Sequence, residues 1–265
     1  MRPPRHLLSH LAALALSLHS FATETVERPD LASHFEAAKV SGTFVLYDVS
    51  ADQLSIYNRE RAETRFSPAS TFKIFNSLAG LESGAVKDLH ERIPYGGQPQ
   101  RRKQWEQDMN LRDAMRVSNV PVFQEVARRI GLSSMHDYLA EVGYGNSEPG
   151  KVVDRFWLDG TLTISAIEQA RFAARLAQRQ LPFSAHNMAL VRDILKLETS
   201  PEHALFAKTG WAAEGKPPVG WWVGWLERGD RIYAFAINID MDEAGNNAPL
   251  RQAVARQCLQ TLKLL

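Results

Sequence analysis

Segments typical of β-strands lie near both ends of this chain, and the sequence between them is mostly helical in pattern. The last two strands are joined by residues 228–230, which predict an antiparallel hairpin. We therefore expect strands from both chain ends to pair in one antiparallel sheet that is flanked by helices, an α+β fold. The strand-like runs are residues 42–48, 55–57, 205–208, 221–226 and 232–239.

A helical region is predicted as an insertion between these strands, from about residue 61 to residue 200. Gly131 follows an amphipathic run and is expected to end that helix. A last helix is expected over about residues 250–262. Three pairs have the spacing of helix starts, namely Ser33 with Glu36, Ser134 with Asp137 and Ser165 with Glu168.

The first 22 residues have the pattern of a secretory signal. Arg2 and Arg5 precede an apolar run over residues 7–18, and small residues lead up to Ala22. The run is short for a bilayer span, so we expect no stable membrane anchor. Cleavage after Ala22 would leave residues 23–265 as one exported, periplasmic domain.

The overall charge gives no reason to expect a nucleic-acid partner. The chain has 31 basic and 30 acidic residues, and residues 1–22 contribute two of the arginines and no acid. Residues 101–103, Arg-Arg-Lys, are the one basic run and are interpreted as a solvated loop. The single cysteine, Cys258, permits no internal disulfide and is expected to be buried.

Ser70 and Lys73 stand three residues apart at the start of an expected helix, so they share one face. A serine becomes a good nucleophile only when a base removes its proton. The apolar neighbours Phe72, Ile74 and Phe75 favour a neutral amine at Lys73, because desolvation lowers the pKa of a lysine. The alternative is a helix-capping serine with a surface lysine, since this spacing alone is a weak signal.

Two further motifs contain groups suited to binding and proton transfer. Lys208-Thr209-Gly210 ends an apolar strand, where Lys and Thr can bind a carboxylate and Gly allows close approach. A strand that ends in a turn explains this motif equally well. Ser118-Asn119-Val120-Pro121 separates two helical runs, and a hydroxyl at that turn can relay a proton. An N-cap for the second helix is the simpler interpretation.

Several other chemistries lack their motifs in this sequence. No G-x-S-x-G nucleophile elbow occurs. The histidines never pair at metal-ligand spacing, so we expect no metal ion. Residues 210–216 imitate a phosphate loop, but Pro217 replaces the Ser or Thr that must hold magnesium. Residues 143–145 lack the third glycine of a dinucleotide loop.

Taken in order, Ser70-x-x-Lys73, Ser118-x-Val120 and Lys208-Thr209-Gly210 resemble the motifs of penicillin-recognising serine enzymes. Within that superfamily the chain resembles the class D β-lactamases, the oxacillinases, from about Gly42 to Arg251. The additional matching segments are Tyr144-Gly145-Asn146, Phe156-Trp157-Leu158, the strand of residues 220–225 and Pro249-Leu250-Arg251.

The resemblance implies hydrolysis of penicillin-type antibiotics, and hence antibiotic resistance. Ser70 would attack the lactam carbonyl, and Ser118 would pass a proton to the leaving nitrogen. Lys73 would be the general base as N6-carboxylysine, formed with carbon dioxide or bicarbonate and with no other cofactor. The resemblance also implies that Trp157 donates a hydrogen bond to the carbamate and that Val120 and Leu158 shield the carbamate from water. The substrate would be bound by Lys208, Thr209, Gly210 and Arg251. The backbone N–H groups of Ser70 and Trp211 would form the oxyanion hole.

Two other functions use the same motifs. A cell-wall transpeptidase or carboxypeptidase would be acylated by penicillin and would deacylate very slowly. A β-lactam sensor would bind covalently without turnover. In each case the expected partner is a small-molecule β-lactam, and the protein itself would be a monomer or a homodimer.

Overall fold

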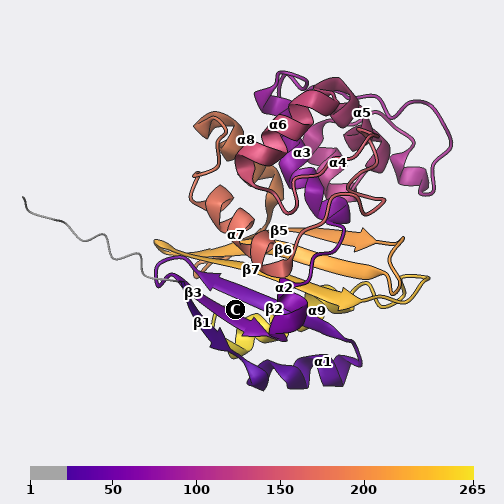
Figure 1. The fold of residues 1–265 in the computed structure, drawn as a ribbon. Coiled ribbons are helices and arrows are strands. Elements are labelled where there is room, and N and C mark those ends of the chain that lie inside the picture. The colour runs from indigo at the N-terminus through magenta and orange to yellow at the C-terminus, as the bar shows by residue number, and fades with distance from the viewer. Residues whose placement is uncertain (1–22) are drawn as a thin grey trace, which may run out of the picture.

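A seven-stranded sheet forms the centre of the protein, with helices on both faces (Figure 1). The computed structural model describes residues 23–265, so the predicted signal sequence lies outside the described residues. The strand order is β1-β3-β2-β7-β6-β5-β4, and every neighbouring pair is antiparallel except β1 with β3. Because β2 pairs with β7, strands from the two ends of the chain meet inside one sheet, and the predicted α+β fold is confirmed.

The predicted strands 42–48 and 232–239 agree with the structure to within one residue. Strand β5 continues to Ala212, so the prediction that Lys208-Thr209-Gly210 ends this strand is wrong, and the motif lies inside it. The 228–230 hairpin is present between β6 and β7, which pair from Val219↔Asp240 to Arg228↔Arg231. Two edge strands, β1 and β4, were not predicted, because each has only four residues with little buried side chain to mark them. The strands are β1 Glu24–Glu27, β2 Gly42–Asp48, β3 Gln53–Tyr57, β4 Lys196–Thr199, β5 Ala204–Ala212, β6 Val219–Arg228 and β7 Arg231–Asp240.

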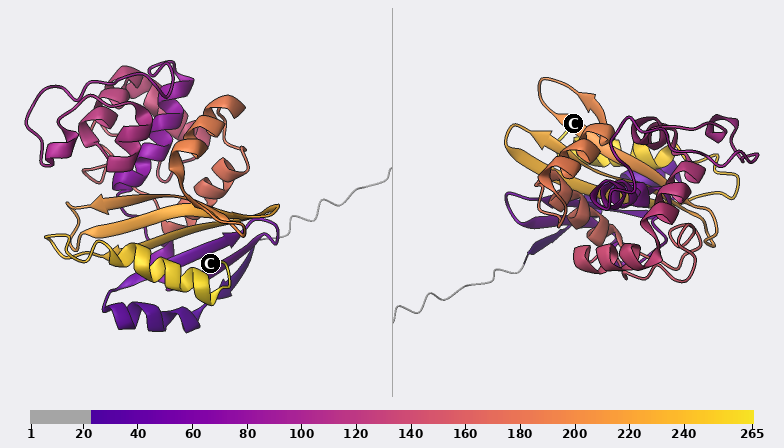
Figure 2. Two further views of the ribbon diagram at one scale, coloured as in Figure 1. Left: turned by 180° about the vertical axis from the view of Figure 1, so that it is seen from behind. Right: turned by 90° about the horizontal axis from the view of Figure 1, so that it is seen from above.

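The helices divide between the two faces of the sheet (Figure 2). One face is covered by α1 (Ala32–Ala38) and α9 (Leu250–Thr261), and α7 (Ala166–Ala177) packs across β2, β6 and β7 on the other. Beyond α7 lies a helical block made of α3, α4, α5, α6 and α8 (Figure 1). The remaining helices are α2 Arg59–Glu63, α3 Lys73–Glu82, α4 Leu111–Val117, α5 Val120–Ile130, α6 Leu132–Val142 and α8 Ala185–Leu195, with short 3-10 helices η1 Pro29–Leu31, η2 Ala69–Phe72 and η3 Lys103–Trp105.

Strand β6 explains why two separate cores form. Successive side chains of a strand point to opposite faces, and here Trp221 and Trp225 pack toward the helical block while Trp222 packs toward α9. All three tryptophans are fully buried and contribute to the two cores. Cys258 on α9 is buried in the second core and is a free thiol, as predicted.

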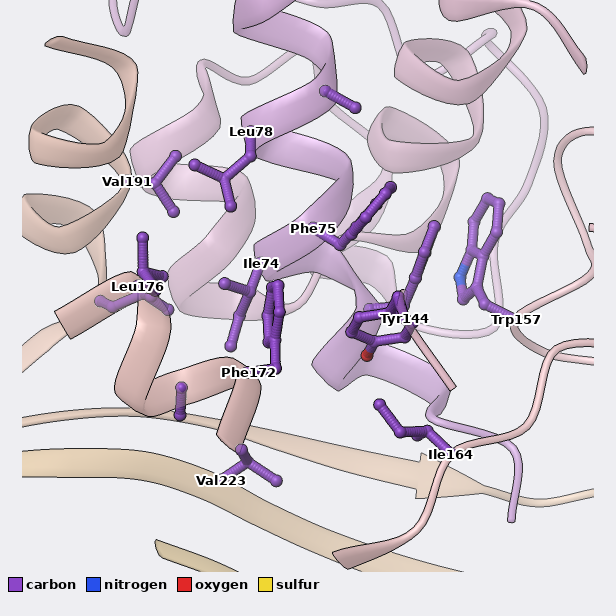
Figure 3. Close-up of a cluster of buried hydrophobic side chains, with 14 of the residues drawn as sticks. Ile74, Phe75, Leu78, Tyr144, Trp157, Ile164, Phe172, Leu176, Val191 and Val223 are labelled. Atoms are coloured by element: carbon purple, nitrogen blue, oxygen red, sulfur yellow. The ribbon is translucent and has the colours of Figure 1, made fainter. Parts of the chain in front are cut away.

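Helix α3 lies at the centre of the helical block and is buried on all sides from Lys73 to Leu81. A helix in such a position is expected to be apolar all round, and its side chains meet those of α7 and α8 in Figure 3. Tyr144 packs against Phe75, with ring centroids 5.2 Å apart, and Trp157 lies at one edge of the same cluster (Figure 3). The first residue of this buried helix is therefore held in a rigid, dry setting.

Some predicted helix boundaries are wrong. No capping box forms at Ser33, because η1 leads directly into α1 and the Ser33 hydroxyl donates to the Asp30 carbonyl. Helix α6 begins at Leu132, before the pair predicted as its start, because Gly131 serves as its N-cap. Gly131 also ends α5, as predicted, and the Ser165–Glu168 capping box of α7 is present. Within residues 23–265, no helix combines the length and the apolar character needed to cross a bilayer.

Candidate active site

Ser70 lies in the 3-10 turn η2, and Lys73 is the first residue of α3. The Lys73 Nζ atom lies 2.6 Å from Ser70 Oγ, within hydrogen-bond distance. The turn before them is strained, since Ala69 has a φ of 46°, a region that non-glycine residues rarely adopt. Gln169 Nε2 donates to Thr71 Oγ1 at 2.7 Å and ties the turn to α7. The two groups thus meet on one face of a fixed turn.

The Lys73 amine is buried among apolar groups, with its Nζ atom 5.5 Å from the centroid of the Phe123 ring. No carboxylate forms a salt bridge with it among the described residues. Burial lowers the pKa of Lys73 well below its ordinary value, and the positive charges of Lys208 and Arg102 lower it further. A neutral amine at this position is able to accept a proton or react with carbon dioxide.

Ser118 supplies a second hydroxyl beside this pair. Its Oγ atom lies 3.3 Å from Lys73 Nζ and 3.0 Å from Lys208 Nζ, so it connects the two lysines. Ser118 has a φ of 56° as the residue that ends α4. The N-cap of α5 is Asn119, whose side chain accepts a hydrogen bond from Val122 N. Because Asn119 does the capping, the Ser118 hydroxyl is free to face the two amines.

Strand β5 forms the opposite wall of the site. Its partner β4 pairs with it only as far as Phe206, so the following edge of β5 lies against η2 instead. A side chain at Gly210 would place a Cβ atom 2.9 Å from the Pro68 carbonyl oxygen. Glycine is therefore needed here because the turn that carries Ser70 approaches the strand closely. Arg251, from α9, donates to the Gly210 carbonyl at 3.3 Å.

The β5 wall is strongly electropositive. Lys208 is buried, and this desolvation, together with the charges of Arg251 and Arg102, lowers its pKa to about 7. Burial also lowers the pKa of Arg251 to about 10, with a smaller contribution from Arg102. Three cationic groups that repel one another in this way would be stabilised by an anion bound between them.

The catalytic turn, the end of α4 and strand β5 surround a cleft of about 380 Å³. Lys73, Trp157 and Lys208 are buried behind this lining, and Lys208 also borders an adjoining hollow together with Thr209 and Arg251. The predicted site residues that line the cleft are Ser70, Ser118, Val120, Leu158, Thr209, Gly210, Trp211 and Arg251.

Trp157 is fully buried and stacks on Phe72, with their ring centroids 5.1 Å apart. Its indole N–H has no hydrogen-bond partner within residues 23–265. A buried donor without an acceptor costs free energy. The Trp157 indole N–H is therefore available to donate a hydrogen bond to an acceptor that binds beside it.

The comparisons with known proteins agree with this geometry. Residues 42–260 match the family model described as the penicillin binding protein transpeptidase domain. The chain is 42% identical to β-lactamase OXA-5 of Pseudomonas aeruginosa over 85% of each chain. It is 38% identical to β-lactamase OXA-48 of Klebsiella pneumoniae over 96% of each chain.

Two solved structures of class D β-lactamases are also similar to this chain in sequence and fold. The class D β-lactamase YbXI from Nostoc is 40% identical, with a TM-score of 0.86 over 89% of this chain and 99% of that chain. FUS-1 (OXA-85), a class D β-lactamase from Fusobacterium nucleatum, is 41% identical, with a TM-score of 0.87 over 90% and 99%. The chain belongs to the class D β-lactamases. It is thus a serine hydrolase.

The Tyr144-Gly145-Asn146 motif of this class D enzyme forms a structural turn. Tyr144 is buried and packs edge-on against Phe172, with ring centroids 4.9 Å apart. Asn146 donates to the Thr161 carbonyl and accepts from Thr163 N. These bonds hold the segment that carries Trp157 and Leu158.

Sequence reasoning missed several residues of this class D site, among them Ala244, Gly245 and Ala248, which line the cleft. The aromatic ring against the Lys73 amine is Phe123, which comes from α5 and not from the neighbouring residues of α3. The loop containing Arg101 and Arg102 is exposed, as predicted, but both residues also line the cleft together with Trp105. Only tertiary packing brings these residues to the site, so no local pattern could have indicated them.

Proposed function

We propose that this protein hydrolyses penicillin-type β-lactams through an acyl-enzyme on Ser70 and thereby confers antibiotic resistance. The observation that supports this most strongly is the 2.6 Å contact between Ser70 Oγ and a buried Lys73 amine with a lowered pKa. The contact supplies both a nucleophile and a base beside an open cleft. The likeness to several class D β-lactamases supports the same reaction.

In the proposed acylation step, Ser70 Oγ bonds to the lactam carbonyl carbon while its proton passes to the base at Lys73. The lactam C–N bond then breaks, and Ser118 passes a proton to the departing nitrogen. Its position 3.3 Å from Lys73 and 3.0 Å from Lys208 supports this relay. Water then attacks the ester, and Ser70 leaves with its proton restored.

The substrate would be held by its ring carboxylate and by its carbonyl oxygen. Lys208, Thr209 and Arg251 offer the carboxylate a cationic and hydroxyl-bearing wall. The backbone N–H groups of Ser70 and Trp211 would form the oxyanion hole. Loss of one donor in such a hole typically costs about 100- to 1,000-fold in rate.

We further propose that Lys73 is carboxylated at Nζ. The neutral amine favoured by burial is the form that reacts with carbon dioxide, and the unpaired Trp157 N–H offers a donor for the product. A carbamate supplies anionic acceptor oxygens for a proton. Val120 and Leu158 line the cleft beside Ser70 and would limit the access of water to that group.

Turnover of a chromogenic cephalosporin, with and without added bicarbonate, tests this proposal. Continuous turnover is expected, and a single burst followed by a stable acyl-enzyme would favour a transpeptidase, a carboxypeptidase or a sensor instead. Intact-mass measurement of the acyl-enzyme lifetime separates these functions. Ser70→Ala should abolish the acyl adduct, and an adduct on that variant would contradict the assignment.

We also propose that the enzyme acts in the periplasm after removal of residues 1–22. The basic start and apolar run of this segment support export. The test is the N-terminal sequence of protein recovered from the periplasm, which is expected to begin at Thr23.

A further inference from the structure

Two successive arginines, Arg101 and Arg102, reach toward opposite walls of the active-site cleft. The Arg101 guanidinium lies 4.9 Å from the centroid of the Trp211 ring on β5. The Arg102 guanidinium lies 5.3 Å from the Trp105 ring, whose N–H donates to the Val117 carbonyl at 3.1 Å beside the end of α4. We call these two residues the arginine pair. The loop that carries it therefore contacts residues on both sides of the cleft.

The arginine pair has no anionic partner among residues 23–265, whereas its neighbours do. Lys103, the next residue, forms a salt bridge with Glu106. Glu214 is the one acidic residue that lines the cleft, and it lies 3.6 Å from Arg155. Stacking on an aromatic ring uses only the face of a guanidinium, so the N–H groups at its edge remain available to an acceptor. The cleft thus has more positive charge than one carboxylate can balance.

In the proposed reaction, the ring carboxylate of the substrate already binds Lys208, Thr209 and Arg251. The acyl side chain of a penicillin lies on the other side of the lactam ring from that carboxylate. We propose that the arginine pair is a subsite for an anionic substituent, specifically a carboxylate, on the acyl side chain of the β-lactam. This inference rests on the proposed function. Paired guanidinium groups suit a carboxylate because each can donate two parallel hydrogen bonds.

The positive charge of Arg102 also acts on the residues proposed to bind the ring carboxylate. It contributes to lowering the pKa of Lys208 and of Arg251 on the opposite wall. A second negative charge on the substrate would relieve this repulsion as well as meet the arginine pair directly. Because the arginine pair is exposed, the effect is expected to be modest and to weaken as salt increases.

The test compares two penicillins that differ only by a carboxylate on the side-chain α-carbon. The readout is the ratio of kcat/KM for the dianionic compound to kcat/KM for the monoanionic compound. The double variant Arg101→Gln with Arg102→Gln should lower this ratio about 3- to 10-fold, as expected for exposed charge pairs. Raising the salt concentration from 50 to 500 mM should lower the ratio of the wild type and leave that of the double variant almost unchanged.

Lys103→Gln is the matched control, since it removes a neighbouring positive charge that is already paired with Glu106. Its ratio should equal that of the wild type. An unchanged ratio in the double variant, or an equal fall in the control, would overturn the proposal. If neither penicillin is turned over, the proposed hydrolysis fails, and the same ratio taken from the rates of Ser70 acylation still tests the subsite.

Discussion

Lys208 Nζ lies 3.0 Å from Ser118 Oγ, although one residue belongs to the sheet and the other to the helical block. This contact joins the two walls of the cleft across its base. The same hydroxyl lies 3.3 Å from Lys73 Nζ, so it contacts both the proposed base and a residue that we propose binds the substrate carboxylate. The charge state of Lys208 is therefore expected to control activity.

The first prediction concerns the alkaline side of the pH profile. Lys208 has a pKa of about 7, so in the free enzyme it is charged below that pH and loses its charge above it. Binding of the substrate carboxylate should weaken as pH rises, and kcat/KM should fall with an apparent pKa of about 7 or higher, since a carbamate anion on Lys73 would raise the pKa of Lys208. Arg251 stays charged through this range because its pKa is about 10. Lys208→Arg should remove the alkaline fall, since an arginine remains protonated. An unchanged profile in that variant would assign the fall to another group.

Trp157→Phe should increase the bicarbonate concentration needed for half-maximal activity by about 10-fold or more, since a bond to a charged group contributes about 1.5–3 kcal/mol. The variant keeps an aromatic ring to stack on Phe72 but removes the unpaired N–H. Trp222→Phe is a matched control, because it also removes a buried, unpartnered N–H, on the other face of the sheet. Equal bicarbonate requirements in the two variants would exclude Trp157 as the donor to a carbamate.

Lys73→Met should abolish turnover yet stabilise the fold in bicarbonate-free buffer. The folded state holds the lysine with a lowered pKa, so at pH 7 the unfolded chain binds a proton that the folded chain does not. Replacement of the buried amine should add about 1–3 kcal/mol to the free energy of unfolding, a rise in Tm of roughly 2–10 °C. The stability cost of Lys73 disappears as pH rises toward the ordinary lysine pKa. The difference in Tm between variant and wild type should thus shrink between pH 7 and pH 10, and a constant difference would contradict this account.

Gly210→Ala should reduce kcat/KM by at least about 10-fold, the effect of a barrier increase of about 1.4 kcal/mol. Its Cβ atom would lie 2.9 Å from the Pro68 carbonyl and would push β5 away from the turn that holds Ser70. Gly229→Ala is a suitable control, because it lies in the β6–β7 turn far along the sheet, where a Cβ atom meets nothing within 4 Å. An alanine at position 229 lowers stability because Gly229 has a positive φ, but the activity of this variant at low temperature should equal that of the wild type. Equal activity losses in both variants would indicate general destabilisation.

Much of this fold could be predicted because its long elements carry strong local patterns. The β6 run of tryptophans and the Ser165–Glu168 capping box are examples. The edge strands β1 and β4 could not be predicted, because their pairing is decided by neighbours far away in the sequence. At the site, Ser70 and Lys73 follow from spacing on one turn. The placement of Phe123 and Arg102 instead depends on how the helical block packs.

The pairing of β2 with β7 also means that the central sheet can be completed only after most of the chain has been synthesised. Residues near position 44 hydrogen-bond with residues near position 237, and Arg251 completes the cleft from the last helix. A nascent chain that stops before β5 would contain the nucleophile and its base but neither the strand wall nor the central sheet. Contacts of such long sequence separation form late and slow folding. A chain that ends before α9 lacks Arg251, so it is expected to bind the substrate weakly, and a complete cleft requires almost the entire chain.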